Sequence, residues 1–365
     1  MPLPQDYLDQ FTESAGYLDF ARFGPPSRAV REASARLLER AATADHSTVD
    51  DLMRADADAR SRAGRLCGIP AEQVVLQPNT STALFQAAFA TGGAVLVSDG
   101  EFPANTYPWS RAAEAGRVQV RRLRPPDGLV TPEVVRAGLD AEVTTVAVSA
   151  VDFRTGHRAD LAGIREVIGD RLLVVDGIQA FGAVEAEWAT ADVLVAGGQK
   201  WLRAGWGTGF AALSPRALDR HRPLLSGWTG ARDPGRFDGE VREPVPGAES
   251  WSITNLSPVS AGALAAALDL VERAGVARIE ARIAERVGEL AEALRSAGAR
   301  ITSAPPPRSG ILTFDVPGRP AREVAADLAA AGIATTGRAE HVRLSPHAST
   351  SADAVRQVAA VLRGR

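Results

Sequence analysis

Short valine-rich runs alternate with helical patterns from about residue 70, and this alternation constrains the fold more than any other feature of the chain. Strands that alternate with helices at this spacing form crossover units and a mostly parallel, buried sheet. The expected strands are 94–99, 118–123, 144–151, 171–177, 191–197 and 209–214, with helices between them such as 81–90 and 160–170. The sequence therefore predicts an α/β fold.

A stretch rich in glycine, proline and charge at about 215–250 reads as a loop and a domain boundary. We expect a large domain over residues 21–245 and a smaller α+β domain made of residues 1–20 plus 246–365. The elements expected after the boundary are two alanine-rich helices, two short strands and a helix between the strands: 258–274, 276–297, 310–316, 342–347 and 321–332.

Composition excludes several classes of protein. The 365 residues suggest about two domains, and a net charge of -3 gives no basic footprint for nucleic acid. No run approaches the ~18 apolar residues of a membrane helix, and the polar, acidic start is unlike a secretory signal, so we expect a cytoplasmic protein. The single cysteine, Cys67, excludes an internal disulfide, and five scattered histidines indicate no metal site.

Lys200 is the only lysine in a chain with 40 arginines. An ε-amine can lose its proton and attack a carbonyl, whereas a guanidinium stays protonated. Lys200 follows the expected strand at 191–197, where ligand-handling residues of parallel sheets gather. The alternative is a chance surface lysine.

Asp176 lies at the end of the preceding expected strand. A carboxylate at one strand end and an amine at the next is the pair that pyridoxal phosphate requires. The lysine forms a Schiff base with the aldehyde, and the carboxylate keeps the pyridine nitrogen protonated. A turn or helix-cap role is the alternative for Asp176.

Three further segments suit such a cofactor and an amino-acid substrate. The run 79–82, which includes Thr80 and Ser81, precedes a helix and could hold a phosphate, although ordinary capping uses the same residues. Phe102 follows a strand and could stack on a planar ring, or belong to the core. Arg343 could bind a substrate carboxylate with two hydrogen bonds, or form a salt bridge.

Two other enzyme classes are disfavoured by particular residues. A nucleotide-binding Walker loop needs Gly-Lys, but Gln199 precedes the only lysine. The glycines of 205–209 precede a strand instead of a helix, which argues against a dinucleotide-binding dehydrogenase. A protein that binds the cofactor without turnover is opposed by the joint presence of Lys200, Asp176 and Arg343.

The segments VVDGIQAFG and ADVLVAGGQKWLRAGWGTGFAALSP resemble the core of the class V aminotransferase and cysteine desulfurase family, pyridoxal phosphate enzymes of fold type I. Residues 17–30, 252–256 and 342–350 are similar to the family's opening, Gly-Thr-Pro-Asn and closing segments. The resemblance implies a mostly parallel seven-stranded sheet in the large domain and a homodimer with shared active sites.

The resemblance also implies roles for individual residues. It assigns cofactor contacts to Thr80, Ser81, Phe102, Asp176, Gln179, Lys200 and Thr254. Gln179 would hydrogen-bond the ring hydroxyl, and Thr254 would hold the phosphate from the neighbouring subunit. Arg343 would bind the α-carboxylate of the substrate.

Departures from the family pattern bear on the reaction. Phe102 stands where histidine is common, as in the kynureninase branch, while Tyr107-Pro108-Trp109 is similar to the desulfurase and selenocysteine lyase branch. Arg338-Ala339-Glu340 occupies the place of the desulfurase cysteine loop, so desulfuration is not expected.

We expect an enzyme that acts on an α-amino acid and cleaves its side chain, as a C–S lyase or a kynureninase-like enzyme does. Class V transamination is the alternative, favoured by Gln199. The sequence assigns no role to Arg22, Arg154 and Arg338, which lie in segments expected near the site, and leaves open whether one of them adds a second substrate contact.

Overall fold

The larger of two sheets has the strand order β1-β7-β6-β5-β4-β2-β3. The structure is a computed structural model that describes residues 2–125 and 127–363, and the seven strands of this sheet all lie within those ranges. Strands β3, β2, β4, β5 and β6 run parallel, whereas β7 is antiparallel to both β6 and β1. The strands are β1 (Val74–Leu76), β2 (Gly93–Ser98), β3 (Val118–Leu123), β4 (Val143–Ser149), β5 (Leu172–Asp176), β6 (Val193–Gly197) and β7 (Gly209–Leu213). The predicted α/β fold with a mostly parallel sheet is confirmed.

The central strands are buried on both faces. Val148 of β4 and Val175 of β5 belong to one apolar cluster, while Ala147 and Val174 belong to a second cluster on the other face. Successive side chains of a strand point to opposite faces, so a strand between two cores must be apolar throughout. This is the physical origin of the valine-rich runs.

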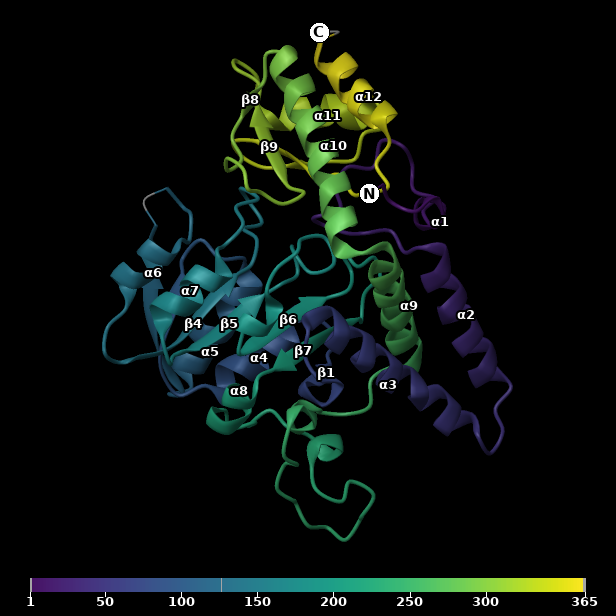
Figure 1. The fold of residues 1–365 in the computed structure, drawn as a ribbon, viewed down its shortest axis with the longest axis vertical. Helices are drawn as coiled ribbons and strands as arrows, with labels where there is room; N and C mark the ends of the chain where they lie inside the picture. The colour runs from purple at the N-terminus through teal and green to yellow at the C-terminus, as the bar shows by residue number, and fades with distance from the viewer. Residues whose placement is uncertain (1, 126, 364–365) are drawn as a thin grey trace.

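Helices cover the sheet and extend beyond it (Figure 1). Several begin after a residue whose side chain accepts a first-turn N–H, as Ser27, Asn79 and Asp160 do. The helices are α1 (Gln5–Leu8), α2 (Arg28–Ala42), α3 (Thr48–Cys67), α4 (Thr80–Ala90), α5 (Tyr107–Glu114), α6 (Pro132–Gly138), α7 (Leu161–Ile168), α8 (Pro215–Arg220), α9 (Pro258–Ala274), α10 (Val276–Ser296), α11 (Ala321–Ala330) and α12 (Ala352–Arg363). None of those in the described ranges is long and apolar enough to cross a bilayer.

The smaller sheet is antiparallel, with the order β10-β11-β9-β8, and lies with α11 and α12 at one end of the molecule (Figure 1). Its strands are β8 (Arg300–Ile301), β9 (Leu312–Asp315), β10 (Thr336–Gly337) and β11 (Val342–Leu344). The start of the chain joins this end, because Tyr17 bridges to Ala334 and Asp19 to Ser345. The domain boundaries given above stay a prediction.

The expected loop at 215–250 is wrong in its first six residues, which form helix α8. Ser214 caps this helix by accepting from the Ala217 N–H, and Pro215 occupies its first position, which proline favours. The rest of the segment is irregular apart from two short 3-10 helices, Trp228–Gly230 and the start of Ala248–Trp251, and it leaves Trp228, Phe237 and Val241 exposed.

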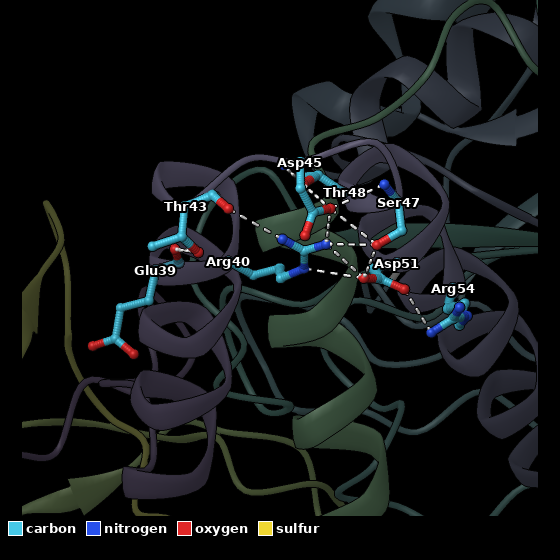
Figure 2. A network of polar contacts seen from close by, with 8 residues as sticks. All are labelled: Glu39, Arg40, Thr43, Asp45, Ser47, Thr48, Asp51 and Arg54. Carbon is cyan, nitrogen blue, oxygen red and sulfur yellow. Dashed lines mark hydrogen bonds and ion pairs between the residues drawn. The ribbon is translucent and has the colours of Figure 1, made fainter.

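The turn between α2 and α3 is closed by one arginine (Figure 2). Arg40 forms ion pairs with Asp45 at 2.7 Å and Asp51 at 2.8 Å, and it also donates to the Ser47 hydroxyl. Asp45 in turn accepts from the Ser47 N–H. The network holds the turn in one conformation at the tip of this helical hairpin.

Candidate active site

Four neighbouring parallel strands end at the same edge of the larger sheet. The segments that follow β2, β4 and β6 carry Phe102, Phe153 and Lys200, while Asp176 is the last residue of β5. The carboxyl ends of parallel strands are where open α/β folds bind ligands. The sequence therefore predicted correctly that Asp176 and Lys200 lie at adjacent strand ends.

The backbone around Lys200 is fixed by hydrogen bonds. The carbonyls of residues 198–200 accept in turn from the N–H groups of Ala204 at 2.8 Å, Gly24 at 2.8 Å and Arg203 at 3.0 Å. A Cβ at Gly24 would lie 2.0 Å from the Lys200 carbonyl oxygen, so only glycine permits this approach. The loop holds Lys200 in place while its side chain extends toward the sheet edge.

The Lys200 amine faces an aromatic ring. Its Nζ lies 5.4 Å from the centre of the Phe102 ring, and the Phe102 ring meets the Phe153 ring edge-on at 5.1 Å. The Phe102 side chain is 39% exposed, so it is not a core residue. An open ring face beside the amine suits stacking on a planar ligand.

Burial shifts the pKa of both ionisable groups toward neutrality. It raises the pKa of the Asp176 carboxyl to about 6, against the hydrogen bond from the Ile178 N–H and the charge of Lys200. It lowers the pKa of the Lys200 amine to about 8; Asp176 opposes this shift and Arg343 adds to it. An amine tuned into this range can both take up and release a proton near neutral pH.

The first turn of α4 offers unpaired donors. The Thr80 hydroxyl oxygen is buried and has no hydrogen-bond partner among the described residues. The helix itself leaves the N–H groups of Thr80 and Ser81 without an intrahelical partner. Such donors at a helix N-terminus suit a phosphate. Ser81 is exposed and lines a hollow of about 310 Å³ together with Phe102.

Two residues that were expected to contact the cofactor, Gln179 and Thr254, have no such direct relation to Lys200. The Gln179 Nε2 donates to the Ala21 carbonyl at 2.9 Å and its Oε1 accepts from the Trp201 indole, which leaves one amide hydrogen. Thr254 is exposed and lines a cleft of about 350 Å³ with Pro78 and Thr82. Within the described part of one chain, Thr254 has no contact with Lys200.

Arg343 lies on β11 and is buried, with one donor left over. Its Nη1 donates to the Phe153 carbonyl at 3.1 Å, and its Nη2 reaches Thr336 at 3.2 Å and Asp19 at 3.4 Å. Its Nε is buried without a partner among the described residues. The salt bridge that was the alternative role for Arg343 is therefore present, and a hydrogen bond to a further anion is still available.

Arg203 was missed by the sequence analysis. Its side chain is 2% exposed, forms an ion pair with Glu13, donates to the Ser349 hydroxyl at 3.0 Å and packs 3.8 Å from the Phe11 ring centre. It does so from a left-handed conformation with φ 60°. These contacts join the lysine loop to both ends of the chain. Only its position three residues after Lys200 could have signalled a role.

The residues present define two ends of one site. One end has an amine, a buried carboxylate, an open aromatic ring and a helix N-terminus with an unpaired hydroxyl, and the other has a guanidinium with an unpaired donor. Among the described residues there is no group of three or more histidine, cysteine or acidic side chains that could hold a metal ion.

Comparison with known proteins decides which family has this arrangement. The sequence model of the family described as Aminotransferase class-V matches residues 25–357. The chain belongs to the class V aminotransferase family. It is therefore an enzyme of that family, and its cofactor is pyridoxal 5'-phosphate. The residues fit this group, because the unpaired Thr80 hydroxyl suits its phosphate, Asp176 its ring nitrogen and Lys200 its aldehyde.

Relatives within the family carry different names. A kynureninase of Deinococcus radiodurans is 32% identical over 244 residues, which cover 64% of this chain and 58% of that protein. An uncharacterized aminotransferase, YcbU of Bacillus subtilis, is 27% identical over 300 residues, which cover 79% of this chain and 78% of that protein. The chain thus matches less than two thirds of the kynureninase.

Solved structures show the fold. A cysteine desulfurase of Thermococcus onnurineus NA1 superposes with a TM-score of 0.88 and 22% identity, over 100% of this chain and 98% of that one. A cystine C-S lyase in complex with its product superposes with a TM-score of 0.87 and 18% identity, over 95% of this chain and 97% of that one. The predicted fold type I is confirmed.

Proposed function

We propose that this enzyme cleaves the side chain of an α-amino acid, as a C–S lyase or a kynureninase-like enzyme does. The observation that carries the proposal is the Lys200 amine, fixed by its loop and facing the exposed Phe102 ring beside the buried carboxylate of Asp176. The relative named kynureninase supports the same choice. Residues 338–340 contain no cysteine, so desulfuration through a loop thiol is not proposed.

When bound, pyridoxal phosphate supplies an aldehyde that takes up amines and a ring that withdraws electrons from the substrate Cα. Lys200 Nζ removes the Cα proton and returns a proton to the product. Asp176 holds the proton on the ring nitrogen, with one carboxylate oxygen fixed by the Ile178 N–H at 3.0 Å. Thr80 and Ser81 would bind the phosphate, Gln179 would donate its remaining amide hydrogen to the ring hydroxyl, and Phe102 would stack on the ring. Arg343 orients the substrate through its α-carboxylate.

Transamination is a second candidate function. It is supported by the aminotransferase of Bacillus subtilis, which matches 79% of this chain, and by Gln199 next to the lysine. Both reactions share the proton transfer at Lys200 and differ in which bond breaks next.

Product analysis of the cofactor-loaded enzyme separates these functions. Incubated with a panel of L-amino acids, the enzyme should release alanine, pyruvate or a thiol over many turnovers. Release of one keto acid per bound cofactor, followed by arrest until a second keto acid is added, would establish transamination instead. Lys200→Ala should lose at least about 10³-fold in rate, whereas Arg322→Gln, an exposed control, should not change it. A protein that takes up no pyridoxal phosphate would contradict both functions.

We also propose that the enzyme is a homodimer in which Thr254 completes the partner's phosphate site. The exposed Trp228, Phe237 and Val241 support an interface along this loop, because large apolar patches mark interaction sites. Mixing Lys200→Ala with Thr254→Val chains tests this. If Thr254 acts across the interface, the mixed dimer regains one intact site of two and so about half of the activity of the wild-type dimer. If it acts within its own chain, mixing restores nothing.

A further inference from the structure

Three arginines to which the sequence gives no role, Arg22, Arg154 and Arg338, lie at the substrate end of the site. The guanidinium carbons of Arg154 and Arg338 lie 5.7 Å and 5.9 Å from the centre of the Phe153 ring. That ring packs edge-on against Phe102, and the Phe153 carbonyl accepts from Arg343. The two guanidinium groups therefore lie near the Phe153 ring. That ring contacts Phe102, which faces Lys200.

Arg154 is already used by its own turn. Its Nη2 forms an ion pair with Asp152 at 2.7 Å, and its backbone N–H donates to the same carboxylate at 2.7 Å. The Thr155 N–H also donates to Asp152. Arg154 thus closes the turn after β4, and its charge is compensated.

Arg22 and Arg338 are not compensated in this way. Neither side chain forms an ion pair or a hydrogen bond within the part of the chain that the structure describes. Burial lowers the pKa of Arg343, Asp19 raises it, and the charges of Arg338 and Arg22 lower it further. Arg343 therefore pairs with one carboxylate, Asp19, and feels the charges of Arg22 and Arg338, whose side chains are exposed. Glu340 is exposed and pairs with none of them.

The hairpin of β10 and β11 sets the spacing between two of these groups. Thr336 lies directly opposite Arg343, and Arg338 stands two positions after Thr336 and continues the pairing through its N–H bond to the His341 carbonyl. Residues two apart on a strand share a face, as do residues directly opposite each other. Arg338 and Arg343 are therefore diagonal neighbours on the same face, with backbones about 7–8 Å apart.

We infer that the substrate is an α-amino acid with a second anionic group on a short side chain, bound by Arg338 while Arg343 binds the α-carboxylate. This inference rests on the proposed function for the presence of an amino-acid substrate. One substrate carboxylate would leave the cluster with surplus positive charge, and a second oxyanion removes that surplus. A planar guanidinium binds carboxylate, sulfinate and sulfonate groups alike through paired hydrogen bonds.

Calorimetry on the cofactor-loaded enzyme tests the inference with non-reacting anions. Succinate and 3-sulfopropanoate carry two anionic groups on chains of equal length, and butyrate, of the same length, carries one. We expect at least one dianion to bind ten-fold or more tightly than butyrate. Tighter binding of succinate assigns a side-chain carboxylate, and tighter binding of 3-sulfopropanoate assigns a sulfur oxyacid. Binding of both dianions no tighter than butyrate would overturn the inference.

Matched variants assign the second contact. Arg338→Gln should weaken dianion binding about ten-fold or more and leave butyrate binding unchanged within two-fold, and Arg338→Lys should recover part of the loss. Arg322→Gln removes an exposed charge from α11 and should change neither. An Arg338→Gln variant that keeps the full preference for dianions would show that Arg338 is not the second contact. Because these anions do not react, a finding of transamination would refute the proposed reaction without touching this result.

Discussion

Arg40 and Arg343 each form a network with aspartate and hydroxyl side chains. The two networks differ in how many of the arginine's hydrogen-bond donors have an acceptor. At the tip of the α2–α3 hairpin, every nitrogen of Arg40 has an acceptor: Asp51 for Nε, the Thr43 carbonyl for Nη1, and Asp45 with Ser47 for Nη2 (Figure 2). At the substrate end, Arg343 keeps a buried Nε without a partner, and the exposed side chains of Arg22 and Arg338 are not paired within the described ranges. A network whose donors are all met stabilises the fold, whereas buried donors left over indicate a ligand.

The largest effect is expected in a third network, around Arg203, which is buried and has acceptors for its donors. Glu13→Gln leaves the Arg203 guanidinium, 2% exposed, without its carboxylate. Breaking a buried pair in this way should lower the free energy of unfolding by about 3–5 kcal/mol, measured by urea denaturation. The double variant Glu13→Leu with Arg203→Met should recover part of this loss. A change below about 1 kcal/mol would show that buried, satisfied networks do not stabilise this fold.

Asp176 supplies the opposite case, a buried acid that we propose pairs with the ring nitrogen of the cofactor. Since burial raises its pKa to about 6, the folded apoprotein binds more protons than the unfolded chain between about pH 4 and pH 6. The stability of the apoprotein should therefore fall by up to about 3 kcal/mol as the pH rises through this range. Asp176→Asn should make this slope shallower by the share of Asp176, while Glu101, whose pKa burial raises to about 7, keeps its own share. An equally steep slope in the variant would assign it to other acids.

Arg343→Gln tests whether the unpaired, buried Nε of Arg343 indicates substrate binding. Removing a charge-assisted contact should raise KM for the amino acid about 100-fold, with a smaller change in kcat. The affinity for pyridoxal phosphate should stay within two-fold of the wild type, because Lys200, Asp176 and Thr80 are held by the larger sheet. An unchanged KM would place the α-carboxylate on a different arginine.

The smallest expected effect is at the hairpin tip. Arg40→Gln removes a satisfied but solvent-accessible network, and exposed ion pairs contribute little. Thermal unfolding should shift by at most about 2 °C, and steady-state kinetics should not change. A loss of activity here would break the distinction between the two networks.

Local patterns were sufficient for most of the large sheet and for one end of the site. The run at 118–123 matches β3, and the strand ends placed Asp176 beside Lys200 because parallel strands share an edge. Strand β1 was missed, since Val74–Leu76 is too short to form a pattern, and α8 was hidden in a segment rich in proline and glycine. The pairing of Asp19 with Arg343 had no local signal, because 324 residues separate them.

That separation has a consequence for biosynthesis. At about 5–20 residues per second, a ribosome finishes Arg343 roughly 15 to 65 s after Asp19. Residues 80–200, which carry the Lys200 amine, the buried Asp176 and the turn proposed to bind phosphate, are complete well before that moment. The nascent chain thus assembles the cofactor end first, while the segment around Asp19 waits for Ser345 and β11 to emerge. Translation that stops in α9 or α10 would yield a chain with the large sheet complete and the substrate end missing.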